Sequence, residues 1–580
     1  MKKTFTKLAG GIMAASMILG TAGVAAPQVF AADDYSITIN NAVEGDKGTH
    51  EYNAYQIFKA QQVSGSELKE ITWGAAIDAS TDGTTAIFDA DTKAALVALF
   101  DGVTVPNVTE GVTAENCTKA TVIANALSTL ADDSAKLKAF SVIMEGIVDK
   151  DTGVKAGSDN KADVADPGYY LILDTNTSAD QKDTYTSEFM LKVAGPTTVN
   201  TKGDLPKSNK TVQDDETDED FGADSIDNKE KDTADYDIGD KVPFTLYGTV
   251  ASNYDQYNVN YKYAFVDQFC AGLDDPTDIV VTATTKTGTV TLKQASDATD
   301  KTGYVISAPT AITGADPFAK EWRISFADLR SVKDDKGNDV KDIVEIRVKY
   351  NSVLNKNAEI GTTDGNPNKS HIEYSNNPNS DQEGKSEDTH VKVFTYEYDV
   401  TKVDANEKPL DGAGFTLYKV SGNTETPVYV DANGKVLTAE ERAALPQDAS
   451  AEVKPAAGNL FNYIGLDEGD YKLVETTVPA GYNKAKDITF TISATQKGTN
   501  DDAAGTDVCI VENVKRGNDA DADAVGGSNG IFNSTVINNS GAELPSTGGI
   551  GTTIFYIVGA AAAVTAIVLL TTRRRANKND

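Results

Sequence analysis

Residues 469–482 read GDYKLVETTVPAGY and combine a short alternating strand with a turn signal. Because side chains alternate along a strand, Tyr471, Leu473 and Glu475 are expected on one face. The Val-Pro-Ala-Gly stretch that follows predicts the end of the strand in a turn. Glutamate is seldom fully buried unless it has a partner. The pattern therefore predicts a carboxyl group on the core face of a β domain, close to some other polar group.

Similar strand patterns flank this segment on both sides. The runs TYEYDVTKVDA, GAGFTLYKV, DITFTIS and STVINN are short, rich in aromatic and β-branched residues, and separated by turn signals. Several such strands in series are typical of an immunoglobulin-like sandwich. Lys402 lies in the opening run, and Val536 and Asn538 share a face of the closing run. If these polar residues face the core, a lysine, a glutamate and an asparagine meet inside one sandwich.

Burial would give this trio a chemistry of its own. Desolvation lowers the pKa of an amine and raises that of a carboxyl group. A neutral Lys402 could attack the Asn538 carboxamide and release ammonia, with a neutral Glu475 polarising the carbonyl. The resulting amide would be worth roughly 4–5 kcal/mol, by analogy with a disulfide that closes a long loop. From the residues alone, a buried Lys–Glu ion pair and a lysine head that reaches solvent both stay open.

Two further β domains are predicted before this one. Residues 33–195 contain the runs YSITINN, YNAYQIF, ELKEITW, GYYLILD and SEFMLKV, with one or two helices expected within 118–149. Residues 196–209 form a linker, and residues 210–395 hold the runs KVPFTLYGTV, YKYAFVDQF, DIVVTATT, WRISFADL and IVEIRVKYNSVL. The expected fold is all-β: tandem immunoglobulin-like sandwiches, with a helical insertion in the first and residues 396–543 as the third.

Both ends of the chain carry targeting signals. Residues 1–32 have a basic start, an apolar stretch and a small-residue cleavage site, which predicts a signal peptide. Residues 544–548 fit the LPxTG pattern that sortases cut: Leu544, Pro545, Ser546, Thr547 and Gly548. Residues 550–572 predict a transmembrane helix, and residues 573–580 a basic cytoplasmic tail. The chain is therefore expected to be exported and held at the membrane until sortase cuts after Thr547.

Composition argues against several other functions. The chain has 53 basic and 87 acidic residues, a net charge of −34, so it is a poor ligand for nucleic acid. Its three cysteines form no evident disulfide framework, and its three histidines are too scattered for a zinc site or a serine-type triad. Asp519, Asp521 and Asp523 imitate the spacing of a calcium loop, yet no glutamate closes it. We expect no cofactor, no metal and no enzyme beyond a single turnover on itself.

The segment YKLVETTVPAGY resembles the E-box (YxLxETxxPxGY) of Cna-B-type domains. With the opening VTKVD and the closing VINNSGAELPSTGG, the chain resembles a backbone (major) pilin of sortase-assembled Gram-positive pili. The likeness extends to IGDKVPFTLYGTV and HIEYSNNPN in the middle domain and to YQIF, ITWG and PGYYLILD in the first. It implies a spontaneous isopeptide bond between Lys402 and Asn538, with Glu475 as catalyst.

The resemblance also implies a second trio in the middle domain. Lys210 opens the first strand of that domain, and Asn376 ends the closing run, in which Ile372 and Tyr374 share its face. Asp267 is the expected acid, and Asp240 is the alternative. No cross-link is assigned in the first domain.

Backbone pilins of this kind carry a YPKN-like motif between their first two domains, and its lysine attacks the sortase-bound threonine of the next subunit. Residues 205–208 read LPKS at that place and depart from the motif at its first and last positions. Lys207 is therefore the predicted polymerising lysine, and Lys202 is close enough to substitute.

The implied function is that of a secreted pilus shaft subunit, anchored to peptidoglycan and supporting adhesion and colonisation. Its implied partners are pilus-type and housekeeping sortases, further copies of the same chain, minor pilins, peptidoglycan and host surface ligands. The alternative is a monomeric LPxTG wall-anchored adhesin, with an isopeptide-stabilised stalk and a ligand site on the first domain.

Overall fold

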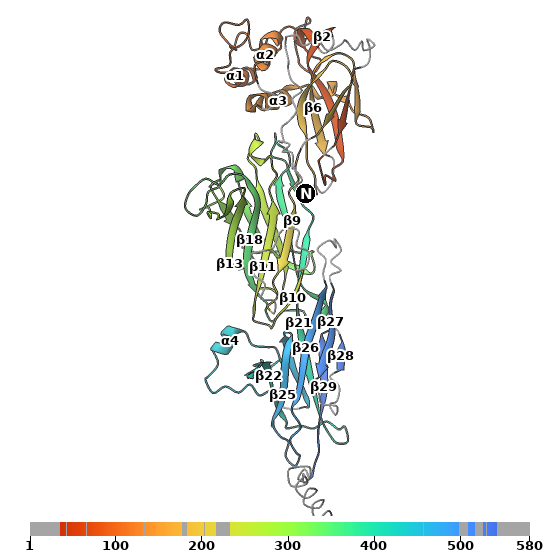
Figure 1. Ribbon diagram of the computed structural model, residues 1–580, viewed down its shortest axis with the longest axis vertical. Helices are drawn as coiled ribbons and strands as arrows, with labels where there is room; N and C mark the ends of the chain where they lie inside the picture. Colours follow the sequence, from red (N-terminus) through yellow and green to blue (C-terminus); the bar gives the residue numbers. More distant parts are fainter. Residues whose placement is uncertain are drawn as a thin grey trace, which may run out of the picture.

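The computed structural model describes residues 35–541, except 42, 65–66, 131–133, 177–181, 202, 216–231, 456–457, 498–507, 517–525 and 529. The described residues form three units, which follow one another along a single long axis (Figure 1). The predicted signal peptide, LPSTG motif, transmembrane segment and basic tail lie outside the described residues, as do Lys202 and the aspartates 519, 521 and 523. Within the described part, no helix is long and apolar enough to cross a bilayer.

The first unit contains two sheets. The smaller has the order β5-β1-β8, and the larger the order β3-β2-β6-β7, with β4 beside β2. Their bounds are β1 Tyr35–Asn40, β2 His50–Ser64, β3 Glu67–Trp73, β4 Val154–Lys155, β5 Lys161–Val164, β6 Gly168–Asn176, β7 Glu188–Val193 and β8 Thr197–Asn200. Alternation along β6 sends Tyr170 and Ile172 into the core shared with the smaller sheet. Tyr169 and Leu171 point into a second core on the opposite face.

Helices cover that opposite face. They are α1 Ala90–Leu99, α2 Ala120–Leu127 and α3 Ala135–Ile147, followed by the short 3₁₀ turn η1 Lys150–Thr152. Phe58 of the sheet stacks on Trp73 at 4.8 Å and on Phe140 of α3 at 6.4 Å. Ser134 caps α3 by accepting a hydrogen bond from the backbone N–H of Leu137. The helices expected within 118–149 are α2 and α3, whereas α1 was not predicted.

The middle unit is a sandwich of two larger sheets. One has the order β14-β13-β18-β11-β9, and the other contains β15-β17-β12-β19-β21. Their bounds are β9 Ser208–Val212, β10 Thr233–Asp235, β11 Lys241–Thr249, β12 Tyr263–Cys270, β13 Thr277–Thr285, β14 Gly288–Thr291, β15 Tyr304–Ile306, β16 Thr310–Ala311, β17 Phe318–Phe326, β18 Ile343–Val353, β19 Gly361–Ser375, β20 Glu383–Lys385 and β21 Thr389–Asp404, with the turns η3 Tyr254–Gln256 and η4 Leu329–Ser331. Phe265, Trp322 and Val348 meet in the core between the sheets.

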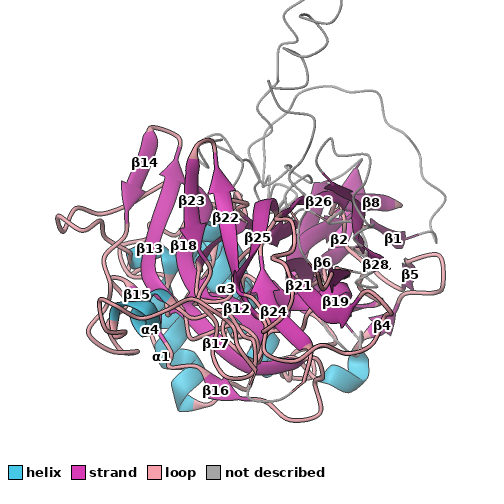
Figure 2. Ribbon diagram, turned by 90° about the horizontal axis from the view of Figure 1, so that it is seen from below, coloured by secondary structure: helices cyan, strands magenta, loops and turns pink. Residues whose placement is uncertain are grey.

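The third unit is again almost entirely β. Strand β21 pairs with β24 and β29, and these face a sheet of order β23-β22-β25-β26-β27. The bounds are β22 Gly414–Ser421, β23 Thr424–Pro427, α4 Ala439–Ala443, β24 Leu460–Leu466, β25 Gly469–Thr477, β26 Ile488–Lys497, β27 Val508–Arg516, β28 Gly526–Ser528 and β29 Ile531–Asn538. Strands dominate the described residues and helices are few (Figure 2). The expected all-β class is confirmed.

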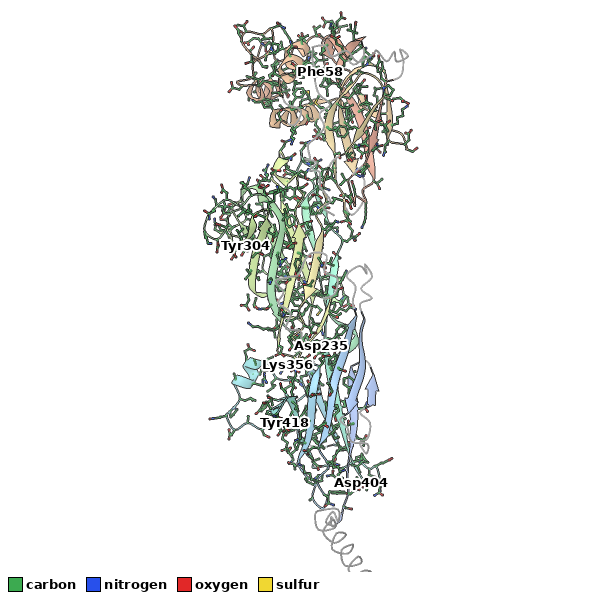
Figure 3. The ribbon with its side chains drawn as sticks, in the orientation of Figure 1. Phe58, Asp235, Tyr304, Lys356, Asp404 and Tyr418 are labelled. Carbon is green, nitrogen blue, oxygen red and sulfur yellow. The ribbon has the colours of Figure 1, made fainter. Side chains whose placement is uncertain are left out.

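A single strand joins the middle and third units. In its first half β21 pairs with β19 and with β10, and from Tyr396 onward it pairs with β24 and β29. The domain boundary predicted at 395/396 thus falls inside one continuous strand. Lys356 of the middle unit adds ion pairs to Asp431 at 3.0 Å and Glu441 at 2.8 Å (Figure 3). Because the backbone is hydrogen-bonded on both sides of the boundary, the joint is stiff.

Candidate cross-link sites

The third unit brings its three predicted residues together. Lys402 lies on β21 opposite Val536 of β29, and Asn538 follows two residues later on the same strand. Glu475 belongs to β25 of the facing sheet. The exposed fractions of the lysine, glutamate and asparagine are 0%, 2% and 1%. A charged group buried this deeply is costly unless it has partners or loses its charge.

Within this trio, a hydrogen bond joins Asn538 to Glu475, while Lys402 bonds to backbone carbonyls. The Asn538 Nδ2 donates to the Glu475 Oε1 at 2.7 Å, and the other oxygen of this carboxyl accepts from the Ala485 N–H at 2.7 Å. The Lys402 Nζ donates to the carbonyls of Val403 at 2.9 Å and Val536 at 3.0 Å. The Lys402 amine therefore contacts β29, the strand that carries Asn538. Glu475 contacts the Asn538 Nδ2, the nitrogen that would leave as ammonia.

The surroundings of Lys402 make its neutral form more accessible than that of a lysine in water. Burial lowers its pKa to about 8, although the nearby Glu475 and Asp404 act in the opposite direction. A lysine head that reaches solvent is excluded by its zero exposure. The amine donates to two backbone carbonyls, and the described residues show no ion pair between Lys402 and Glu475.

The middle unit holds its lysine in a similar setting. Lys210 of β9 is fully buried, and its Nζ lies over the rings of Phe244 and Tyr350 at 5.1 and 5.2 Å. The same nitrogen contacts the Asp267 carboxylate and donates to the Tyr350 hydroxyl at 2.8 Å. Burial lowers the pKa of Lys210, against the attraction of Asp267. The predicted lysine and acid of this unit are thus in direct contact.

The structure does not bring the predicted asparagine of the middle unit, Asn376, to Lys210. Asn376 lies beyond the end of β19, where its Nδ2 donates to the Thr184 Oγ1 of the first unit at 3.1 Å. Asn368, on the same strand, is 1% exposed, and its Nδ2 donates to the Tyr350 hydroxyl at 2.7 Å. Asn368 and Asn376 are an even number of residues apart, so strand alternation allows the same face for both. It does not say which position along the strand lies near Lys210. Asn368 and Lys210 bond to the same Tyr350 hydroxyl, so Asn368 is the asparagine that we assign to this trio.

The alternative acid of the middle unit, Asp240, also lies away from Lys210. The backbone of Asp240 bonds to Leu354 and Asp237 near the joint with the third unit. Burial, and then the charge of Asp237, raise the pKa of Asp240 to about 6. Asp267, and not Asp240, contacts Lys210.

Lys207 lies directly before β9, and its side chain is exposed. Its backbone is fixed: its N–H donates to the Thr249 Oγ1 at 2.8 Å, and its carbonyl accepts from the Thr249 N–H at 2.9 Å. Leu205, two residues earlier, is buried in the core of the middle unit. The predicted linker is therefore packed here, and it presents the lysine amine from a fixed base.

In the first unit, a buried ion cluster involves residues that the sequence analysis did not single out. His50 lies between Asp174, at 2.9 Å from its Nδ1, and Asp46, at 3.1 Å from its Nε2, and all three side chains are at most 7% exposed. Burial lowers the pKa of His50, but the hydrogen bonds to Asp174 and Asp46 outweigh it and raise this pKa to about 10. The cluster ties the loop after β1 to β6.

The pKa of His50 is near 6.5 in the unfolded chain and about 10 in the folded one. The contribution of the charged cluster to the stability of the first unit is therefore fully present below pH 6.5. This contribution is lost as the pH rises through 10. We expect His50→Gln to reduce the free energy of unfolding of this unit by about 3 kcal/mol below pH 6.5 and by little above pH 10. Hydrogen exchange of β2 and β6 peptides measures the difference. His390→Gln in the middle unit is the control, and a difference that does not change with pH would contradict the prediction.

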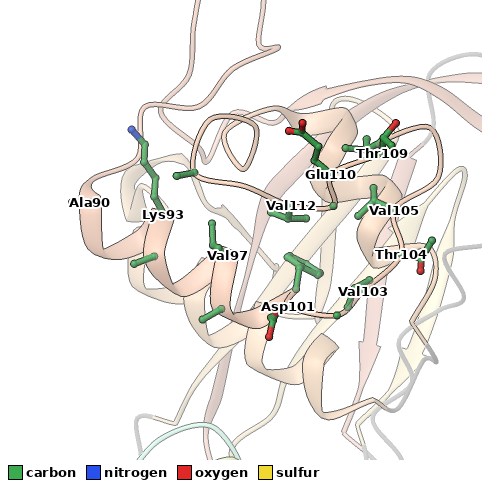
Figure 4. Close-up of a pocket in the computed structure, with 17 residues that line it drawn as sticks. Ala90, Lys93, Val97, Asp101, Val103, Thr104, Val105, Thr109, Glu110 and Val112 are labelled. Atoms are coloured by element: carbon green, nitrogen blue, oxygen red, sulfur yellow. The ribbon is translucent and has the colours of Figure 1, made fainter.

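The first unit also carries a groove with a volume of about 980 Å³ (Figure 4). It lies between α1 and the loop that follows this helix. Val97, Val103, Val105 and Val112 make much of its wall apolar, and Lys93 stands at one side. On the adhesin alternative, a ligand would bind in a place of this kind.

Comparison with known proteins places two parts of the chain. Residues 396–504 match the prealbumin-like fold domain family, SpaA, and residues 537–579 match the LPXTG cell wall anchor motif. The chain is 27% identical over 246 residues to the trypsin-resistant surface T6 protein of Streptococcus pyogenes serotype M6, over 37% of this chain and 45% of that protein. The chain thus aligns with somewhat less than half the length of this curated relative.

Two solved structures of backbone pilins align with most of this chain. The T6 backbone pilin of serotype M6 Streptococcus pyogenes superposes with a TM-score of 0.48 at 15% identity, over 89% of this chain and 100% of that one. The full-length major pilin SpaD of Corynebacterium diphtheriae gives 0.43 at 15% identity, over 88% and 98%.

The matched families define a class: a secreted surface protein with a cell wall anchor and a prealbumin-like SpaA domain. Within that class the chain is homologous to the trypsin-resistant surface T6 protein over the 246 aligned residues.

Proposed function

We propose that this chain is the major subunit of a pilus shaft, joined covalently by sortase to further copies of itself and finally to peptidoglycan. Its Cna-B-type sandwiches are stiffened by two intramolecular Lys–Asn isopeptide bonds. The observation that carries the proposal is the pairing, in each of two sandwiches, of a fully buried lysine with a buried carboxyl and a buried asparagine. Minor pilins and host ligands are further partners of the assembled fibre.

The chemistry proposed for the third unit follows from its contacts. The neutral Lys402 amine attacks the Asn538 carboxamide, and the C–N bond to the amide nitrogen breaks. Glu475, 2.7 Å from this nitrogen, is placed to donate a proton as it leaves as ammonia, and the carboxylate then takes up the proton that the attacking nitrogen loses. In the middle unit Lys210 is the attacking amine, Asn368 supplies the carboxamide, and Asp267 is the buried acid of the trio.

Polymerisation needs an amine that another protein can reach. The side chain of Lys207 is exposed next to the boundary between the first and middle units, and its backbone is bonded to β11. We propose that this amine resolves the acyl-enzyme formed when sortase cuts between Thr547 and Gly548 of another copy. The fixed backbone limits the search that the amine must make, while its four-carbon stem supplies reach.

The partner of Lys210 can be tested by comparing two asparagines of the same strand face. Asn368→Ala is expected to leave the chain with one cross-link, so its intact mass lacks one ammonia. Asn376→Ala is the matched control and is expected to lack two, like the natural chain. Intact-mass spectrometry of the full chain from a sortase-deficient host gives both values. A chain that still lacks two ammonia molecules after Asn368→Ala contradicts the assignment, and a natural chain that lacks none contradicts the proposed cross-links.

A further inference from the structure

The hydroxyl group of Tyr350 lies at the centre of the middle trio. Tyr350 is on β18 and is 3% exposed. Its oxygen accepts from the Lys210 Nζ at 2.8 Å and from the Asn368 Nδ2 at 2.7 Å, and its proton is donated to the Asp267 Oδ2 at 3.0 Å. A phenol has one donor and two acceptor positions. All of them are used, and each goes to a different member of the trio.

The ring that carries this hydroxyl is held on two sides. Phe244 of β11 stacks on it with 5.2 Å between ring centres and 21° between planes. Trp322 of β17 meets it edge-on, at 5.1 Å and 79°. Packing of this kind fixes the ring without using its polar atom. The hydroxyl therefore stays between the attacking amine and the amide nitrogen.

We propose that Tyr350 is a catalytic residue of the cross-linking reaction in the middle unit, where it passes a proton from the attacking amine to the departing amide nitrogen. This inference rests on the proposed function, because it presupposes that Lys210 and Asn368 react.

The proton balance of the reaction requires such a transfer. As the Lys210 Nζ bonds to the Asn368 Cγ, the bond from Cγ to Nδ2 breaks, and ammonia leaves. One proton must go from the first nitrogen to the second, and the two nitrogens have the Tyr350 oxygen as a common neighbour. Once the attack has made Cγ tetrahedral, the Nδ2 carries a lone pair. The hydroxyl then turns its proton from the Asp267 Oδ2 to Nδ2, and its oxygen gains a proton from Nζ, while Asp267 balances the charge that develops. No other reactant is needed.

Comparison with the third unit gives a reason for proton transfer through Tyr350 in the middle unit. There Glu475 itself contacts the Asn538 Nδ2 at 2.7 Å, so the carboxyl can act on the leaving nitrogen directly. In the middle unit the acid is an aspartate, which is one methylene shorter. The hydrogen bonds given above join Asp267 to Asn368 through the Tyr350 hydroxyl. The Tyr350 hydroxyl therefore bridges the acid and the amide nitrogen in the middle unit, whereas Glu475 bonds to the amide nitrogen directly in the third.

The test is Tyr350→Phe in the full chain, which keeps the ring and removes the hydroxyl. The rate of bond formation in the middle unit should fall by about 100-fold or more, the usual contribution of a positioned acid or base. Newly made chains should then keep the Asn368 amide, while the bond between Lys402 and Asn538 forms normally in the same molecules. Peptide mass spectrometry on samples taken at increasing times after synthesis measures both. Tyr263→Phe, which removes a buried hydroxyl bonded to the Thr249 carbonyl, is the control.

Two outcomes separate this inference from the proposed function. If the natural chain joins Lys210 to Asn368 and Tyr350→Phe does so at the same rate, the role of Tyr350 is overturned alone. If the natural chain leaves both residues unmodified, the proposed cross-link is overturned, and the role of Tyr350 with it. Fluorotyrosine at position 350 covers the case in which Tyr350→Phe disturbs folding. It changes the acidity of the hydroxyl at nearly constant size, so an unchanged rate would overturn the relay.

Discussion

Lys207→Ala is expected to abolish the high-mass polymers of this chain that survive boiling in SDS. Sortase would still cut after Thr547, but the acyl-enzyme would meet no amine on the next subunit. The chain would then be found only as monomers joined to the wall. The loss should be complete, because the transfer needs a nucleophile and the backbone around Lys207 is fixed by Thr249. Immunoblots of wall extracts from cells that carry pilus-type sortase measure the ladder.

Lys202→Ala is the matched control for this experiment, and it should leave the ladder intact. If Lys202→Ala removes the ladder and Lys207→Ala does not, the polymerising lysine has been assigned wrongly. If the natural chain forms no ladder, the monomeric adhesin is the better account, and the groove on the first unit becomes the place to look for a ligand.

Glu475→Ala is expected to prevent the cross-link of the third unit. The intact mass should then fall short of the mass calculated from the variant's sequence by one ammonia, whereas the natural chain falls short of its calculated mass by two. Losing the bond removes a constraint on the unfolded chain across a loop of well over ~100 residues, which is worth roughly 4–5 kcal/mol. Urea unfolding followed by hydrogen exchange of β25 and β29 should show the loss, and trypsin should cut the third unit at lower concentrations.

Glu452→Ala is a matched control, because this carboxylate bonds Thr476 and Thr477 of the same unit outside the trio. It should lose the same ammonia as the natural chain. Glu475→Ala chains that still form the bond at the natural rate would show that the glutamate is not the catalyst. The middle unit of either variant should keep its own cross-link.

The position of the proposed cross-links would give them a mechanical role. Strand β21 runs from the middle unit into the third, where it pairs in parallel with the last strand, β29. A bond from Lys402 to Asn538 would join these two strands directly. The bond from Lys210 to Asn368 would join the first strand of the middle unit to β19, which pairs with β21. Tension along the fibre would then pass from bond to bond through one shared strand.

The third-unit trio could be predicted from sequence because strand alternation and the E-box both apply to it. Glu475 shares the face of Tyr471 and Leu473, and these neighbours are buried as expected. The asparagine of the middle unit could not be placed in this way. Asp267 faces Ser370 across β12 and β19, strands that are far apart in sequence and not joined by a hairpin. Alternation gives the face of β19, but no local signal gives its register.

Two other features could not be predicted from the sequence, for similar reasons. Tyr350 lies in an alternating strand, where a tyrosine is interpreted as core, and its role appears only when two sheets meet. Both halves of β21 have the composition of an ordinary strand. The sequence therefore does not show that one strand continues across the unit boundary. In each case the missing information concerned which distant strands pack together, which composition and periodicity do not encode.

The most direct test of the central claim is tandem mass spectrometry of a tryptic digest of the natural chain. The account predicts two branched peptides, one joining Lys402 to Asn538 and one joining Lys210 to Asn368, each lighter by one ammonia than its two components. Linear peptides that carry all four residues unmodified, in a chain that has folded, would contradict it.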